Sequence, residues 1–168
     1  SNYTLIKAKY KSFIPEFPSS QFNHVILSVP LQKDTMWLEC TSQTMAPGYL
    51  GDFTDDRYAL LIDEDGGKLV RTPKYHLNDN LQVRKINANV DASGLATINV
   101  DGFYEALQQD HLHGLIKALS RDKVKDYLNE AFNLPNYELT SYDYKEVKAP
   151  LPVIKENLQI SAGNYATI

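Results

Sequence analysis

The chain has 168 residues, of which 43% are hydrophobic and 23% charged, so it can form one domain or two small ones with ordinary cores. Its net charge of -4 and isoelectric point near 5.5 argue against nucleic-acid binding, which usually needs a basic surface. The sequence contains no run of about 18 apolar residues, the length that a membrane-spanning helix needs. The single cysteine excludes a disulfide within the chain.

The first half of the sequence predicts short strands joined by turns. A short turn at 30–34 should pair the strands before and after it in an antiparallel hairpin, and the segment Glu64-Asp65-Gly66-Gly67 is typical of a tight hairpin turn. A polar segment at 73–80 then interrupts the pattern, which predicts one domain over 3–76 and a second over 78–168. The strands expected in the first domain cover 3–10, 21–29, 35–41, 57–63 and 68–72.

The second half predicts strands on either side of two short helices. Apolar residues recur at helical spacing over 107–119 and again over 121–132, where Ser120 is a suitable N-cap. We expect an α+β, β-rich fold of antiparallel hairpins, with the helices inserted in an accessory β-sandwich-like domain. The expected strands cover 81–90, 95–104, 137–147 and 158–168. The first of them has a phase shift between Val83 and Ile86 that suggests a bulge or a change of buried face, and its candidate inward residues are Leu81, Val83, Ile86, Ala88 and Val90.

His24 and Glu39 are the candidate catalytic residues. His24 lies in one predicted strand and Glu39 near the end of the next, so an antiparallel hairpin would bring their side chains together on one face. A carboxylate beside an imidazole fixes its tautomer and stabilises its protonated form, as in a nucleophilic triad. No cysteine precedes His24, and strand alternation should point Cys40 away from it. A purely structural histidine beside a glutamate is the other interpretation.

The segment His24…Trp37-Leu38-Glu39-Cys40-Thr41 resembles the transglutaminase-like, papain-like cysteine peptidase core. The further segment Gly48-Tyr49-Leu50-Gly51…Arg57-Tyr58-Ala59-Leu60-Leu61 is similar to multidomain bacterial proteins in which this core precedes a C-terminal β-domain of unknown function. The resemblance implies acyl transfer or amide hydrolysis on a peptide or protein, with His24 as general base and acid and Glu39 orienting it. It also implies a location in the cell envelope, in the periplasm or outside the cell.

This sequence departs from the family pattern in two ways. The acid is usually Asp rather than Glu39, and the next residue is commonly Pro rather than Cys40. The resemblance places the nucleophilic cysteine tens of residues before His24, so residues 3–76 would be the trailing β-hairpins of an incomplete core and this chain alone would be inactive. A non-catalytic β-domain that binds a protein, peptide or glycan is the alternative, which the eleven tyrosines favour.

A further expectation concerns self-association. Val25, Leu27 and Val29 give the histidine strand an apolar face, and the helix that would cover it in a complete core is missing. We therefore expect a homo-oligomer through residues 3–41, by edge pairing or by exchange of strands.

Other motifs suggest no cofactor or metal. Asp110-His111-Leu112-His113 offers two possible ligands in a helical segment, which is too few for a metal site. The acidic residues over 52–65 lack the order of a calcium loop, and Gly66-Gly67 lacks the Lys-Ser/Thr and helix of a phosphate loop.

Overall fold

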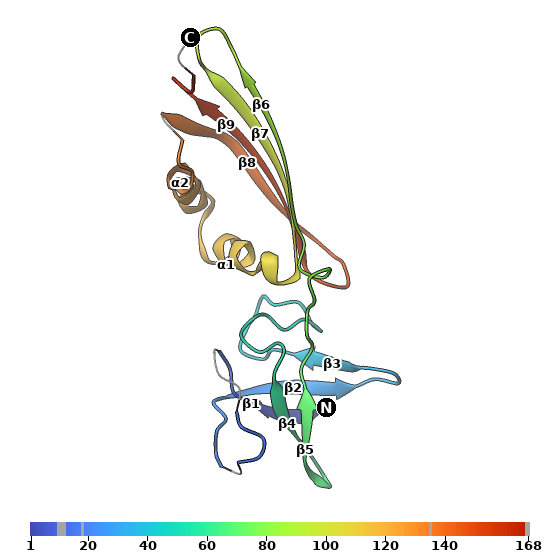
Figure 1. Cartoon of the computed structure of the whole chain (residues 1–168). Coiled ribbons are helices and arrows are strands. Elements are labelled where there is room, and N and C mark those ends of the chain that lie inside the picture. Colours follow the sequence, from blue (N-terminus) through green and yellow to red (C-terminus); the bar gives the residue numbers. More distant parts are fainter. Residues whose placement is uncertain (10–12, 18, 135, 167–168) are drawn as a thin grey trace. The chain divides into compact units, whose positions relative to one another are not determined.

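The computed structural model describes residues 1–9, 13–17, 19–134 and 136–166. The chain divides into two compact units, Ser1–Asn78 and Asp79–Ile168, and the division falls inside the polar segment 73–80. Each unit contains one antiparallel sheet, and the α-helices belong to the second unit (Figure 1). The expected α+β, β-rich fold class is therefore confirmed.

Unit 1 contains a five-stranded sheet in the order β3-β2-β1-β4-β5. The first strand of the chain lies at its centre, where Thr4 pairs with Ile26 of β2 and with Leu61 of β4. The turn at 30–34 joins β2 to β3, as the sequence predicts. The strands are β1 (Asn2–Ile6), β2 (His24–Pro30), β3 (Thr35–Leu38), β4 (Tyr58–Asp63) and β5 (Gly66–Arg71).

One face of this sheet forms the core of unit 1. Strand residues there pack with Leu50, which comes from the long segment between β3 and β4. Thr4 and Ser28 are also fully buried, and the Thr4 hydroxyl donates to Ser28 Oγ over 3.1 Å, so this polar pair is satisfied within the core. The apolar members of the cluster are Ile6, Ile26, Trp37, Leu50 and Ala59.

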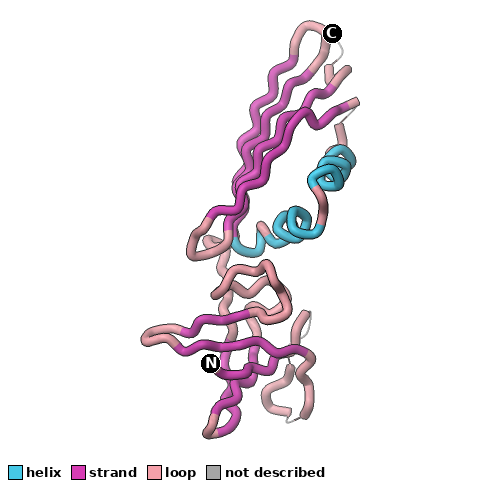
Figure 2. Tube along the Cα trace, turned by 180° about the vertical axis from the view of Figure 1, so that it is seen from behind, coloured by secondary structure: helices cyan, strands magenta, loops and turns pink. Residues whose placement is uncertain are grey.

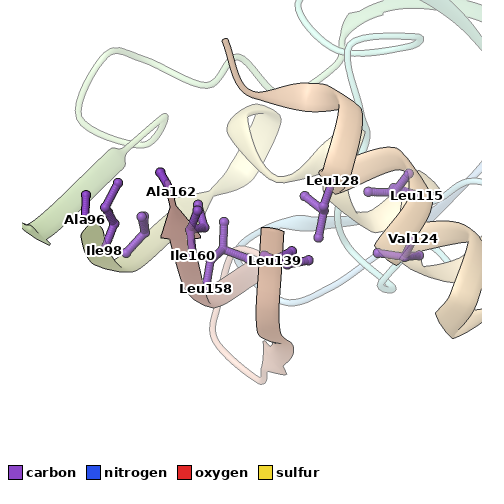
Figure 3. Close-up of a cluster of buried hydrophobic side chains, with 10 residues drawn as sticks. Ala96, Ile98, Leu115, Val124, Leu128, Leu139, Leu158, Ile160 and Ala162 are labelled. Atoms are coloured by element: carbon purple, nitrogen blue, oxygen red, sulfur yellow. The ribbon is translucent and has the colours of Figure 1, made fainter. Parts of the chain in front are cut away.

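Unit 2 contains a four-stranded sheet in the order β6-β7-β9-β8. The helices lie along one side of it (Figure 2), and their buried residues Leu115, Val124 and Leu128 join the sheet in one core (Figure 3). The Ser120 side chain accepts from Lys123 N, which confirms the predicted N-cap. The elements are β6 (Gln82–Val90), β7 (Ala96–Glu105), η1 (Ala106–Gln108), α1 (Asp110–Ala118), α2 (Arg121–Ala131), β8 (Tyr137–Val147) and β9 (Val153–Ala162).

The expected β-sandwich in the second half is wrong. The described residues of unit 2 form a single sheet, because the helices already cover the face that a second sheet would need to cover. The last strand also begins at Val153 rather than at 158, directly after the proline-bearing connection. Tyr10, at the end of the first expected strand, and residues 167–168, at the end of the last, lie outside the described residues.

The expected inward residues of the 81–90 strand are exposed. β6 is an edge strand whose residues are all accessible to solvent, so its apolar side chains do not belong to the core. The pairing of β6 with β7 is continuous, and the register shift lies in β8, between Leu139 and Ser141. The exposed residues are Leu81, Val83, Ile86, Ala88 and Val90.

Candidate functional site

The β2–β3 hairpin brings His24 and Glu39 together. His24 is the first residue of β2, and Glu39 directly follows β3. Because Ser28 pairs with Trp37 and Leu27 with Leu38, continuing the register places Glu39 on the face of the sheet that carries His24. The predicted placement on adjacent antiparallel strands, with both side chains on one face, is confirmed.

The two side chains form a close and shielded pair. His24 Nε2 lies 2.9 Å from Glu39 Oε1 and 3.0 Å from Oε2, and the side chains are only 11% and 3% exposed. A carboxylate can only accept, so Nε2 carries the hydrogen and the neutral ring keeps its lone pair on Nδ1. Within the described part of the chain, no hydrogen bond engages Nδ1. The pair therefore presents an oriented imidazole with one nitrogen available to take a proton.

Thr41 completes the environment of the Glu39 carboxylate. Glu39 Oε1 accepts from the Thr41 backbone N over 3.1 Å and from Thr41 Oγ1 over 2.7 Å. With the imidazole, this oxygen has three donors, and hydrogen bonds to a charged group are the stronger kind. Thr41, two residues after Glu39, thus folds back to fix the carboxylate that in turn fixes the histidine.

Phe53 packs against the other side of the imidazole. Its ring centroid lies 5.0 Å from that of His24 and the two rings meet edge to face. The Phe53 carbonyl accepts from Lys9 N over 3.0 Å, which ties the 51–56 loop to the chain that follows β1. The sequence analysis did not identify Phe53, because an aromatic residue in a loop gives no signal of its spatial neighbour.

Arg57 holds the same loop in place, and the sequence analysis missed this role too. Its side chain is 10% exposed, and its guanidinium donates to the carbonyls of Lys7, Lys9, Asp52 and Asp55. An arginine beside acidic residues suggests a surface ion pair, and only the fold shows that its main partners are backbone oxygens. Arg57 therefore fixes the loop that carries Phe53.

Cys40 and Trp37 do not take part in the pair. Cys40 is exposed, and its Sγ contacts Leu38 O at 3.6 Å rather than either member of the pair. Trp37 is buried in the core of unit 1. Cys40 is thus badly placed to act as the nucleophile.

The remaining candidate groups have other partners. His111 Nε2 lies 3.1 Å from Tyr127 Oη, whereas His113 Nδ1 lies 2.9 Å from Glu146, so the two histidines do not converge. In the acidic segment, Asp56 pairs with Lys74 and Arg71. The Lys74 hydrogen bond in particular lowers the pKa of Asp56, as expected for a solvated ion pair.

Comparisons of the chain with protein-family models, curated proteins and solved structures give no match. None of the helices in the described part of the chain has the length and apolar character that crossing a bilayer requires. The support for the candidate site therefore comes from its geometry.

Proposed function

We propose that unit 1 supplies the general base and its orienting acid to a cysteine-dependent acyl-transfer site that acts on peptide or protein amides. The observation that carries this proposal is the shielded His24–Glu39 pair, with Thr41 on the carboxylate and Nδ1 left available. The resemblance of the His24…Glu39-Cys40-Thr41 segment to transglutaminase-like cores supports the same chemistry.

In this mechanism, His24 Nδ1 takes the proton from a thiol, and the thiolate attacks the amide carbonyl carbon. The Glu39 carboxylate stabilises the imidazolium that forms and keeps Nδ1 directed to the reacting atoms. Nδ1–H then donates its proton to the leaving amine, and a thioester remains, which water or a second amine cleaves. Cys40 does not serve as the nucleophile, so the proposal requires a cysteine other than Cys40.

The competing interpretation is a structural pair that only ties the start of β2 to the end of β3. Both interpretations expect Glu39→Gln to lower stability, so stability alone cannot separate them. Turnover can, since only the catalytic interpretation requires the imidazole for the reaction, and reactivity at Nδ1 tests whether the geometry that the proposal needs is present.

The first test uses the chain as it is. In ¹⁵N-histidine NMR, neutral His24 should show the Nε2–H tautomer, and Glu39→Gln should remove that preference. Diethyl pyrocarbonate should then modify Nδ1 of His24, with His24→Ala as the blank and His76→Ala as the matched control. An Nδ1–H tautomer, or an imidazole that resists the reagent in the folded protein, would contradict the proposal.

The second test concerns activity. In a preparation that supplies the cysteine required by the proposal, His24→Ala should lower kcat for peptide amide or ester cleavage by about 10²–10⁴-fold. Glu39→Gln should lower it less, because the imidazole remains, and Cys40→Ser should leave it unchanged. Turnover that is indifferent to His24, or that is lost with Cys40, would overturn the assignment of roles.

A further inference from the structure

The sheet of unit 1 has a second face that is almost entirely apolar. Strand side chains alternate between faces, so the positions between the core residues project from the opposite side of the sheet. Gly67 and Arg71 are the exceptions on that side, and the Arg71 guanidinium stacks on the Tyr58 ring at 4.6 Å and binds Asp56. The remaining positions define the open face: Tyr3, Leu5, Val25, Leu27, Val29, Met36, Leu38, Tyr58, Leu60, Ile62 and Leu69.

The strand register makes this open face continuous. One row of paired residues crosses four strands as Leu38, Leu27, Tyr3 and Ile62. The next row crosses four strands as Val25, Leu5, Leu60 and Leu69. Paired side chains on one face lie about 5 Å apart, so the two rows form a single apolar surface rather than scattered residues.

The open face is accessible to solvent. Tyr3 is 68% exposed, Leu69 45% and Val25 42%, whereas Ile6 and Ile26 on the other side of the same strands are fully buried. Isolated exposed apolar residues are common, but a contiguous surface of this kind on a folded protein usually marks a binding site. We therefore expect the open face to bind a partner.

We propose that the open face binds the same face of a second copy of this chain. None of its residues is charged, and the guanidinium of Arg71, at the margin of the same side, is already engaged by Asp56 and Tyr58, so stacking two copies opposes no free like charges. Sheets with apolar faces pack at about 10 Å in two layers, the arrangement of a β-sandwich. When a twofold axis relates the two copies, the same surface of each copy packs against the other.

The size of the face fits a concentration-dependent dimer. Five strands of this length present about 500 Å² on one face, so two copies would bury about 1,000 Å², near the lower limit for a specific interface. The proposal goes beyond the proposed function, because His24 and Glu39 lie on the opposite side of the sheet. It also differs from pairing of strand edges or exchange of strands within 3–41, since β4 and β5 contribute to the surface.

Sedimentation equilibrium over a range of concentrations tests the proposal. The wild-type chain should form a dimer, and Val25→Lys or Ile62→Lys should weaken it by about 100-fold or more, because each places a charge inside the apolar interface. Val83→Lys is the matched control, since Val83 is an exposed strand residue of unit 2. It should leave the dimer unchanged. The tryptophan emission of Trp37 checks that each variant keeps the unit 1 core.

A second measurement covers variants that fail to fold. In a Cys40→Ser background, Val25→Cys should form a disulfide-linked dimer faster than Val83→Cys under mild oxidation. A wild-type chain that stays monomeric at every concentration would overturn the proposal. A dimer that is lost with Val83→Lys but survives Val25→Lys would also overturn it. So would an open face that is covered in the monomer by another segment of the same chain, or by a different molecule.

Discussion

The two sheets of this protein differ in the face that does not belong to the core. In unit 2, the outward residues of β7 and β9 are mostly polar, as in Thr97, Asp101, Lys155, Asn157 and Gln159, and Asn157 donates to Asp101 over 2.8 Å. In unit 1, the corresponding face is apolar. Unit 2 thus covers its central strands with its helices and presents mainly polar residues on the outward side of β7 and β9, whereas unit 1 has apolar surface left for a partner.

The buried polar groups differ in the same way. In unit 2, both carboxylate oxygens of Glu156 are used, since Tyr104 Oη donates to one over 2.7 Å and Tyr144 Oη to the other over 2.9 Å. Arg84 Nε donates to Tyr104 Oη in turn. In unit 1, the His24–Glu39 pair keeps Nδ1 without a hydrogen bond among the described residues. A network whose polar atoms are all hydrogen-bonded stabilises the fold, whereas an imidazole nitrogen without a hydrogen bond can also accept a proton in a reaction.

The largest expected effect tests the covered core of unit 2 against the open face of unit 1. Leu128→Ala removes a buried side chain of α2 from the core, which should lower the free energy of unfolding of unit 2 by about 3 kcal/mol. Leu69→Ala on the open face should lower that of unit 1 by less than about 1 kcal/mol in the monomer, because the side chain is already partly in water. Urea titrations can follow helical circular dichroism for unit 2 and the single tryptophan, Trp37, for unit 1.

Similar decreases in the free energy of unfolding for Leu128→Ala and Leu69→Ala would contradict the contrast between the covered core and the open face. The helical signal is specific because the α-helices of the described chain belong to unit 2. A large loss in Leu69→Ala that disappears on dilution would instead show that the monomer–dimer equilibrium contributes to the measured stability.

The next effect concerns Arg57, the internal support of the site in unit 1. Arg57→Gln cannot reach the carbonyls of Lys7, Lys9, Asp52 and Asp55 together, so we expect unit 1 to lose about 3 kcal/mol. Arg71→Gln removes an exposed pair with Asp56 and should cost at most about 1 kcal/mol. Urea titration followed by Trp37 fluorescence measures both. Equal effects of the two substitutions would show that Arg57 is an ordinary surface arginine.

A smaller effect tests the open polar pair. Thr41→Val keeps the shape of the side chain but removes the Oγ1 donor to Glu39, which should cost unit 1 about 1–2 kcal/mol. Because the carboxylate loses one of its fixed donors, the ¹⁵N signals of His24 should also report a less uniform ring orientation. Thr4→Val is the matched control, since it removes a buried hydroxyl pair away from the site. Unchanged His24 signals in Thr41→Val would show that Thr41 does not position the pair.

The sequence was sufficient for the hairpin that carries the site, because His24 and Glu39 lie close together along the chain and strand alternation sets their faces. It was insufficient for Phe53 and Arg57, which reach the site through contacts with distant backbone that no local pattern encodes. Apolar alternation also failed to distinguish an edge strand from a central one, so the residues of β6 were expected inside the core. The missing information in each case is which element covers which face.

The smallest effect uses the closed network of unit 2. Burial and the hydrogen bonds to Glu156 raise the pKa of Tyr104 and of Tyr144 above the ordinary value. In the unfolded chain both would ionise near pH 10, so their contribution to stability is complete below about pH 10 and is lost as the pH rises toward the folded pKa values. Urea midpoints of the helical signal should therefore fall above about pH 10.

Glu156→Gln serves as the control for this pH dependence. It removes the negative charge that opposes ionisation of Tyr104 and Tyr144, so the alkaline loss of stability should become shallower while the contribution from burial remains. Tyrosinate absorbance recorded with the urea titrations links ionisation to unfolding. Among the described residues, the tyrosines with a raised pKa belong to unit 2, so the Trp37 transition of unit 1 should depend less on alkaline pH. If the eleven tyrosines titrated together near pH 10 while unit 2 stayed folded, the network would be open to water and the contrast between the two units would fail at this point.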